Sequence, residues 1–192
     1  TRVEESDADQ TFTVGLIYGP SGCGKSSLVK AGLLPRLAKS VLSVYIEATP
    51  EDTESRLLKG VRKVRPDLPA SAGLVDSLIA VRQGRAVPSG SKVLLVLDQF
   101  EQWLHARRGE PHTELVAALR QCDGEHLQAI VMIRDDFWMA ATRLLRDLEI
   151  SLLEGHNTAA VDLFDPTHAR KVLAAFGAAH GKLPERAADL AR

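Results

Sequence analysis

The chain has 192 residues, of which 45% are hydrophobic, so it can bury one sizeable core but not two full domains. Its 24 basic and 25 acidic residues leave a formal net charge of -1, which gives no reason to expect a polyanion or an anionic membrane surface as a partner of the whole molecule. Cys23 and Cys122 stand far apart and outside any metal-type or paired spacing, which indicates a reduced, cytoplasmic protein.

The two ends of the chain indicate an excerpt of a longer protein. Residues 1–10 form an acidic, polar lead-in without the apolar centre of a signal peptide, and no later stretch is long enough to span a bilayer. The chain begins without Met and stops within a helical pattern. We therefore expect further domains in the same polypeptide and no contact with a membrane.

Apolar segments at regular intervals have the length and composition of buried strands. The first, residues 11–18 (TFTVGLIY), is rich in β-branched and aromatic residues and ends at Gly19. Residues 92–98 (KVLLVLD) are almost continuously apolar, as in a parallel sheet that is covered on both faces. The remaining strands are expected at residues 41–48, 127–133 and 158–164.

Helical patterns separate these strands. The helix expected at residues 25–39 contains Gly32 and Pro35, which should bend or end it. Further helices are expected at residues 51–65, 74–83, 99–107, 113–121 and 135–148. The alternation predicts a three-layer α/β/α fold with a five-stranded, mostly parallel sheet over residues 11–164. Asp165 followed by Pro166 is typical of a helix start, so we expect residues 165–192 to begin a helical subdomain that is truncated here.

The loop after the first strand has the composition of a triphosphate-binding loop. Several backbone N–H groups must meet a β-phosphate at once, and Gly19, Gly22 and Gly24 permit the backbone to wrap it closely. The Lys25 ammonium can meet the β- and γ-phosphates, and the Ser26 hydroxyl is placed to hold Mg²⁺. Because this match follows a strand and opens a helix, it predicts a P-loop NTPase that binds ATP or GTP with Mg²⁺. The residues predicted to bind the nucleotide are Gly19, Pro20, Ser21, Gly22, Cys23, Gly24, Lys25, Ser26 and Ser27.

Asp98 ends the strand at residues 92–98, where a carboxylate can hold Mg²⁺. A helix N-cap is the alternative role, and both roles can coexist. Many P-loop ATPases carry a glutamate at the next position to polarise the attacking water. This chain has Gln99, which can orient water but cannot accept its proton, so either turnover is slow or another carboxylate serves.

Glu101 is the nearest candidate for that carboxylate. On a helix, Phe100, Trp103 and Leu104 share a face that should meet the core, which leaves Glu101 on a different side from which it can reach the site. A solvated surface glutamate is the alternative.

Arg134 ends the fourth strand, which in this architecture lies beside the P-loop strand and directs its C-terminal end at the ligand crevice. An arginine there can contact the γ-phosphate and so distinguish a triphosphate from a diphosphate. A salt bridge with Asp135 or Asp136 is the alternative.

Cys23, the histidines and a run of basic residues are interpreted as structural rather than functional. A thiol at a helix N-terminus can act as a redox sensor, but we interpret Cys23 as a small side chain that fits the loop. The scattered histidines make no metal site. A basic run is interpreted as a solvated helix face, because it has no interleaved aromatic residues, and nucleic acid is not expected as a partner. Its members are Arg56, Lys59, Arg62, Lys63 and Arg65.

Parts of the chain together resemble the novel STAND NTPase domains of bacterial multidomain signalling proteins. These are GPSGCGKSSLVKAGLLPRL (residues 19–37), VLLVLDQFEQWL (residues 93–104) and IVMIRDDF (residues 130–137). In addition, VDLFDPTHARKVLAAFG (residues 161–177) is similar to the family's passage from the last strand into its helical subdomain. The resemblance covers most of the chain.

The resemblance implies a relative of the AAA+ ATPases, with ATP and Mg²⁺ as ligands and slow hydrolysis acting as a signalling switch. It also implies effector and sensor domains in the same polypeptide, often with a serine/threonine protein kinase as effector, and self-association on ATP binding. Lys25 and Ser26 match the family's Walker A pair, and Asp98 matches its Walker B acid. Glu101 matches the acid of DQFE, and Arg134 matches the sensor arginine of the fourth strand.

Three other classes of P-loop protein share parts of this pattern. A P-loop kinase of small molecules uses a similar loop but normally carries an arginine-rich lid, and no convincing lid is present in the sequence. An ABC-type transport ATPase needs an LSGGQ-like signature, which is also missing. A module that binds nucleotide without significant turnover stays open, because Gln99 stands where a base is often found.

Overall fold

The computed structural model describes residues 2–5, 7, 10–84, 91–108, 110, 113–163 and 165–179. The chain divides into two compact units, residues 1–161 and residues 162–192. The part of the expected helical subdomain after residue 179 lies outside the described residues.

The first unit is built on a five-stranded sheet whose strand order is β2-β3-β4-β1-β5. The strands are β1 (Val14–Gly19), β2 (Val41–Glu47), β3 (Lys92–Asp98), β4 (Leu127–Arg134) and β5 (Thr158–Ala160). All the pairings between these strands are parallel, and β4 lies beside β1 as predicted. β5 is shorter than the expected strand at residues 158–164. Among the described residues, the hydrogen bond from the Val161 N–H to Tyr18 O is the last one between this segment and β1.

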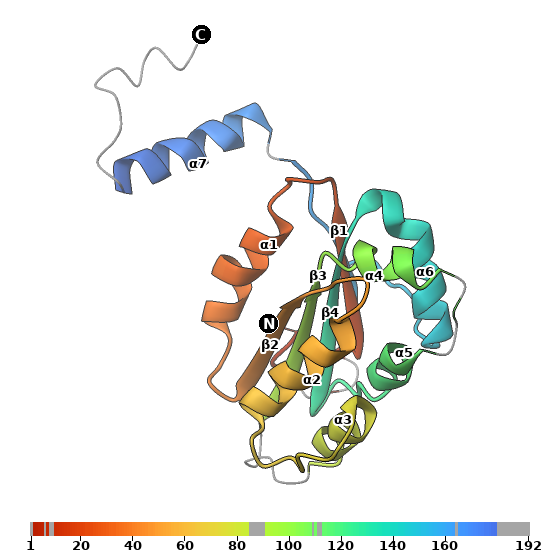
Figure 1. The fold of residues 1–192 in the computed structure, drawn as a ribbon. Coiled ribbons are helices and arrows are strands. Elements are labelled where there is room, and N and C mark those ends of the chain that lie inside the picture. Colours follow the sequence, from red (N-terminus) through yellow and green to blue (C-terminus); the bar gives the residue numbers. More distant parts are fainter. Residues whose placement is uncertain are drawn as a thin grey trace. The chain divides into compact units, whose positions relative to one another are not determined.

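Helices cover both faces of this sheet, which confirms the expected α/β/α layering (Figure 1). On one face the apolar side chains of α2 (Thr53–Val64), α3 (Leu74–Arg82), α4 (Glu101–Ala106), α5 (Glu114–Leu119) and α6 (Trp138–Asp147) form the larger core with the strands. Every residue of β3 is buried, as expected for a central strand that is covered on both sides.

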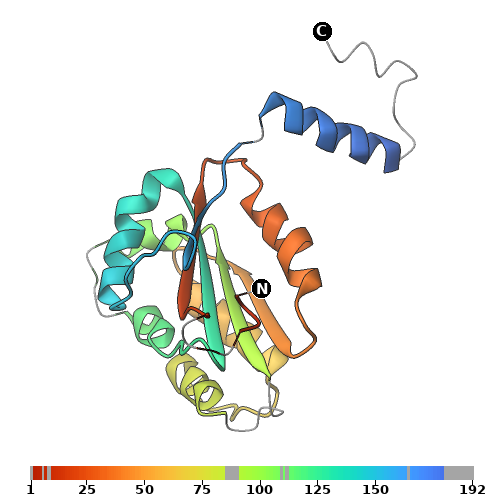
Figure 2. The ribbon, with the colours of Figure 1, turned by 180° about the vertical axis from the view of Figure 1, so that it is seen from behind.

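The opposite face is covered by the helical run that follows the phosphate loop (Figure 2). Val29 from this run packs with Leu94, Val96 and Met132 of the sheet in a second, smaller core. Val3 of the N-terminal lead-in is buried in the same core, so the lead-in is more than a polar extension.

The helical run after the loop is shorter and less regular than the helix expected at residues 25–39. It consists of α1 (Lys25–Ser27), the π-helix η1 (Leu28–Leu33) and the 3₁₀ turn η2 (Leu34–Arg36). Pro35 lies inside the last turn, and Leu37 is already extended, because proline offers no N–H to continue the helical ladder. The predicted effect of proline is therefore confirmed, whereas the π-helix was not foreseen.

One residue of the basic run, which directly follows α2, departs from the solvated face that the sequence indicates. Arg65 is only 2% exposed, and its Nε and Nη2 donate to the two carboxylate oxygens of Asp67 at 2.9 and 2.8 Å. These hydrogen bonds hold the pKa of Asp67 below its ordinary value. The interpretation of Arg65 as a solvated side chain was wrong, because a carboxylate two residues later meets the charge locally.

The second unit contains α7 (Pro166–Ala179) within its described part. Proline occupies its first helical position, as the sequence predicts. Val172, Leu173 and Phe176 are exposed on this helix. Within the described residues, no helix has both the length and the apolar character that crossing a membrane requires.

Candidate nucleotide site

The predicted phosphate loop lies at the C-terminal edge of the parallel sheet. It connects β1 to α1, and Asp98 and Arg134 end the neighbouring strands β3 and β4 at the same edge (Figure 1). Ligands of open α/β sheets bind outside this edge, where the strand order departs from the chain order. The fold thus gathers residues that stand far apart in the sequence.

Glycines give this loop a backbone that other residues would strain. Gly22 and Gly24 have φ values of 79° and 94°, in the left-handed region. A Cβ atom on Gly19 would overlap the carbonyl oxygen of Val161, which lies directly against the loop. Ser21, Gly22 and Ser27 are exposed, so backbone groups at the tip of the loop are accessible to a ligand.

The Lys25 side chain lies back against its own loop. Its Nζ donates to Gly19 O at 2.8 Å and to Pro20 O at 2.9 Å, and it lies 3.6 Å from Cys23 Sγ. Cys23 is buried, in agreement with its interpretation as a small residue that fits the loop. The ammonium is therefore held at the loop by weak acceptors that a phosphate can replace.

Asp98 is a buried carboxylate with neutral hydrogen-bond donors. It is 2% exposed, its Oδ1 accepts from the Gln99 N–H at 2.8 Å, and its Oδ2 accepts from the Tyr45 hydroxyl. Among the described residues, no cation lies within ion-pair distance of this carboxylate. A buried carboxylate without a counter-charge is suited to a cation that arrives with a ligand.

Tyr45, Lys30 and Glu47 belong to this part of the molecule and were not predicted from the sequence. Lys30 on η1 donates to Glu47 at the end of β2 at 3.1 Å, and its ammonium lies 4.5 Å from the centre of the Tyr45 ring. The pairing of β2 with β3 places Glu47 opposite Asp98, at the sheet edge that carries the phosphate loop. The sequence alone does not give this pairing, so the contribution of β2 was not foreseen.

The two residues considered for water activation have different surroundings. Gln99 is exposed, has a left-handed φ of 52°, and accepts a hydrogen bond from Gln102 through its side-chain oxygen. Glu101 is partly buried, and its Oε2 is shielded from solvent without a hydrogen-bond partner in the described part of the chain. Phe100, Trp103 and Leu104 face the core as expected, which leaves Glu101 on another side of α4.

Arg134 forms the salt bridge that was considered as its alternative role. Its Nε donates to Asp136 Oδ1 at 3.1 Å and its Nη2 donates to Asp136 Oδ2, with about half of each side chain exposed. An ion pair so exposed contributes little to stability, so it does not bar Arg134 from another anion.

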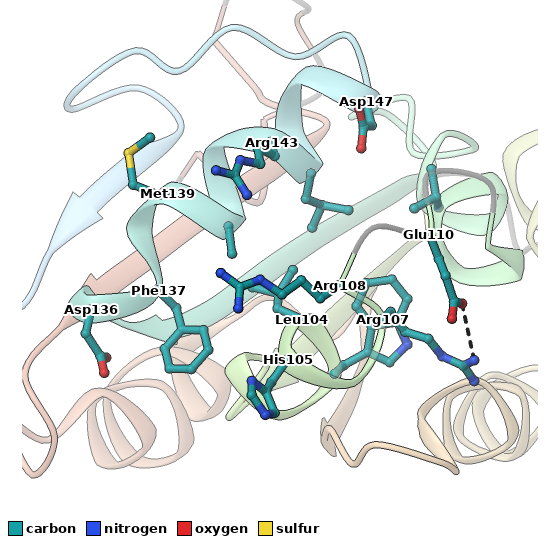
Figure 3. Close-up of a pocket in the computed structure, with 14 residues that line it drawn as sticks. Leu104, His105, Arg107, Arg108, Glu110, Asp136, Phe137, Met139, Arg143 and Asp147 are labelled. Carbon is teal, nitrogen blue, oxygen red and sulfur yellow. Dashed lines mark hydrogen bonds and ion pairs between the residues drawn. The ribbon is translucent and has the colours of Figure 1, made fainter.

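A separate groove of about 560 Å³ lies between α4 and α6, and none of residues 19–27 lines it. Arg108 and Arg143 line it together with Leu104 and Phe137 (Figure 3). Within the described residues, no cluster of three or more His, Cys, Asp or Glu side chains could hold a metal by itself.

Solved structures share the fold at low sequence identity. The chain matches a structure of Drosophila ORC bound to DNA with a TM-score of 0.66 at 15% identity, covering 96% of this chain and 45% of that one. It matches the Aeropyrum pernix ORC2 protein, solved as ADPNP-ADP complexes, with a TM-score of 0.61 at 19% identity, covering 88% and 46%. It also matches a Walker-type ATPase of Pyrococcus abyssi with a TM-score of 0.58 at 17% identity, covering 96% and 59%. The chain thus spans about half the length of these structures, and the likeness shows a P-loop ATPase fold.

No curated protein is significantly similar in sequence to the chain. A sequence profile of the family described as novel STAND NTPase 1 matches residues 2–182. This match includes the phosphate loop, all strands of the sheet and α7. The chain belongs to the novel STAND NTPase 1 family.

Proposed function

We propose that this chain binds ATP with Mg²⁺ and hydrolyses it slowly, as a nucleotide-controlled switch within a larger, cytoplasmic signalling protein. The observation that carries the proposal is the buried Asp98 carboxylate, which has no cation partner among the described residues and ends β3 at the sheet edge where the phosphate loop follows β1. A loop that only turned the chain would not need an uncompensated buried charge at its side.

The loop and Lys25 hold the phosphates in this proposal. The exposed backbone of Ser21 and Gly22 offers N–H groups, and the Lys25 ammonium leaves the carbonyl oxygens of Gly19 and Pro20 for phosphate oxygens, which carry more negative charge. Pro20, Cys23, Gly24, Ser26 and Ser27 complete the nucleotide-binding residues.

The donor set of this edge fits Mg²⁺. Magnesium prefers oxygen ligands and in nucleotide sites takes one or two from protein side chains, with phosphate and water oxygens as the rest. Ser26 and Asp98 would supply the protein oxygens here. When bound, the ion neutralises charge that develops on the phosphates.

Slow turnover follows from the residues beside Asp98. Gln99 has no proton-accepting group and its side chain is engaged with Gln102, so it cannot act as the base. Glu101 then has the role of positioning or deprotonating the water, and its shielded Oε2, which has no hydrogen-bond partner among the described residues, supports this. Arg134 acts as the γ-phosphate sensor after exchanging Asp136 for the phosphate.

Replacing Asp98 by asparagine tests the metal role. The asparagine side chain keeps the shape and one acceptor oxygen but loses the charge that attracts Mg²⁺, so we expect Mg²⁺ to lose its strengthening effect on nucleotide binding while binding in EDTA persists. Calorimetric titrations with and without Mg²⁺ measure this difference. Asp76→Asn, on the exposed side of α3, is the matched control. Full Mg²⁺ dependence in Asp98→Asn would remove Asp98 from the metal site.

Replacing Glu101 by glutamine tests the catalytic role. We expect a loss of turnover of roughly 10²-fold with unchanged nucleotide affinity, because the substitution removes only the proton-accepting oxygen. Phosphate release over time measures turnover. Glu114→Gln is the control, because Glu114 is the first residue of α5 as Glu101 is of α4, but is exposed on another helix. Equal turnover in Glu101→Gln and wild type would exclude Glu101 from the mechanism.

The partners belong to the proposal as well. We infer that effector and sensor domains lie elsewhere in the same polypeptide, with a serine/threonine kinase as one such effector, and that ATP binding promotes self-association. A module that binds nucleotide without turnover stays the second candidate, because Gln99 cannot serve as a base; wild-type turnover that Glu101→Gln reduces would contradict it.

A further inference from the structure

Tyr45 lies on the edge strand β2, on the face of the sheet that the helical run after the phosphate loop covers. Its ring packs against the small core that includes Val29 of that run and Val96 of β3. In the parallel register, Tyr45 is opposite Val96, so its hydroxyl reaches diagonally along β3 toward Asp98.

The Tyr45 hydroxyl contacts a predicted magnesium ligand. It donates a hydrogen bond to Asp98 Oδ2, since an ionised carboxylate can only accept. Burial, followed by this hydrogen bond, raises the pKa of Tyr45 far above its usual range.

Lys30 also contacts the tyrosine ring. The Lys30 ammonium lies 4.5 Å from the ring centre and pairs with Glu47 at 3.1 Å. The ring position therefore does not depend on the hydroxyl, which can be removed without removing the contacts of the ring.

We propose that Tyr45 is a positioning residue for the Mg²⁺ site, because its hydroxyl holds Asp98 Oδ2 and so fixes the orientation of the carboxylate that would meet the ion. The inference rests on the proposed Mg²⁺–ATP function and adds a residue from the edge strand to it. A metal-binding carboxylate that accepts a hydrogen bond from a fixed donor keeps its orientation, and such donors tune metal affinity.

The test is Tyr45→Phe in the full chain, which keeps the ring and removes only the hydroxyl that donates to Asp98. Binding of a non-hydrolysable ATP analogue is measured by calorimetry in EDTA and over a series of Mg²⁺ concentrations. We expect affinity in EDTA to match wild type and the Mg²⁺ concentration at half effect to rise about tenfold, the usual cost of losing a residue that orients a metal ligand. Tyr18→Phe is the control, because Tyr18 is the chain's other tyrosine and packs on Trp138 instead.

Each other outcome overturns the proposal in a distinguishable way. An unchanged Mg²⁺ response in Tyr45→Phe would show that the hydrogen bond to Asp98 has no role in the metal site, and a stronger response would show that Tyr45 competes with the ion. An equal loss of affinity in EDTA and in Mg²⁺, or a lowered melting temperature, would show a role in packing only. If wild-type binding does not respond to Mg²⁺ at all, the proposed function itself fails, and the role of Tyr45 falls with it.

Discussion

Nucleotide binding should fall by at least roughly 100-fold when Lys25 is replaced by alanine, because the substitution removes charge-assisted hydrogen bonds to two phosphates. Lys25 is the cation that the structure places within the loop, with Nζ 2.8 Å from Gly19 O and 2.9 Å from Pro20 O. Calorimetry with ATP and Mg²⁺ on the longest available form of the protein measures the loss.

Lys39→Ala is the control for charge, since Lys39 is exposed beyond the end of the helical run. The melting temperatures of both variants separate a binding defect from unfolding, because Lys25 also ties the two ends of the loop together. Wild-type affinity in a folded Lys25→Ala protein would contradict the phosphate role of the whole loop.

Replacing Gly19 by alanine should destabilise the first unit by roughly 3 kcal/mol, the upper part of the usual range for overpacking a well-filled site. The new Cβ would overlap Val161 O and lie 3.2 Å from Cys23 Sγ, and a backbone carbonyl cannot turn aside as a flexible side chain can. Chemical denaturation measures the loss. Because relief of the overlap moves the loop, nucleotide affinity should fall in the same variant.

Gly73→Ala is the matched control, because a Cβ at Gly73 meets no heavy atom within 4 Å and its φ is -69°. Because Gly73 is the N-cap of α3 and alanine caps less well than glycine, Gly73→Ala should cost no more than roughly 1 kcal/mol. If Gly19→Ala and Gly73→Ala have equal stability, the packing of Val161 against the loop is not close in solution.

The layers and the strand positions could be predicted because local patterns determine them. The strand expected at residues 92–98 is β3 with the same bounds, since a continuously apolar run with a charged residue at each end has one plausible length. The pairing of β1 with β4 also follows from the fold class. The short β5 was less predictable, because apolar residues near 161–163 continue after pairing with β1 has ended.

The candidate site was predictable only where residues are close in sequence or end a strand. The loop residues, Asp98 and Arg134 lie at one sheet edge, but their roles stay predictions. Tyr45 could not be identified, because its relation to Asp98 depends on the pairing of two strands and on a side chain that reaches two residues along the neighbour. A tyrosine in a buried strand is ordinarily core, and no spacing in the sequence distinguishes this one.

The carbonyl that lies against Gly19 belongs to Val161, the last residue of the first unit. Its N–H donates to Tyr18 O at 2.8 Å, so the end of the first unit is held beside the strand that leads into the phosphate loop. The chain therefore leaves the first unit next to Gly19. A substitution that disturbs Gly19 should alter the phosphate loop and the end of the first unit together, rather than the loop by itself.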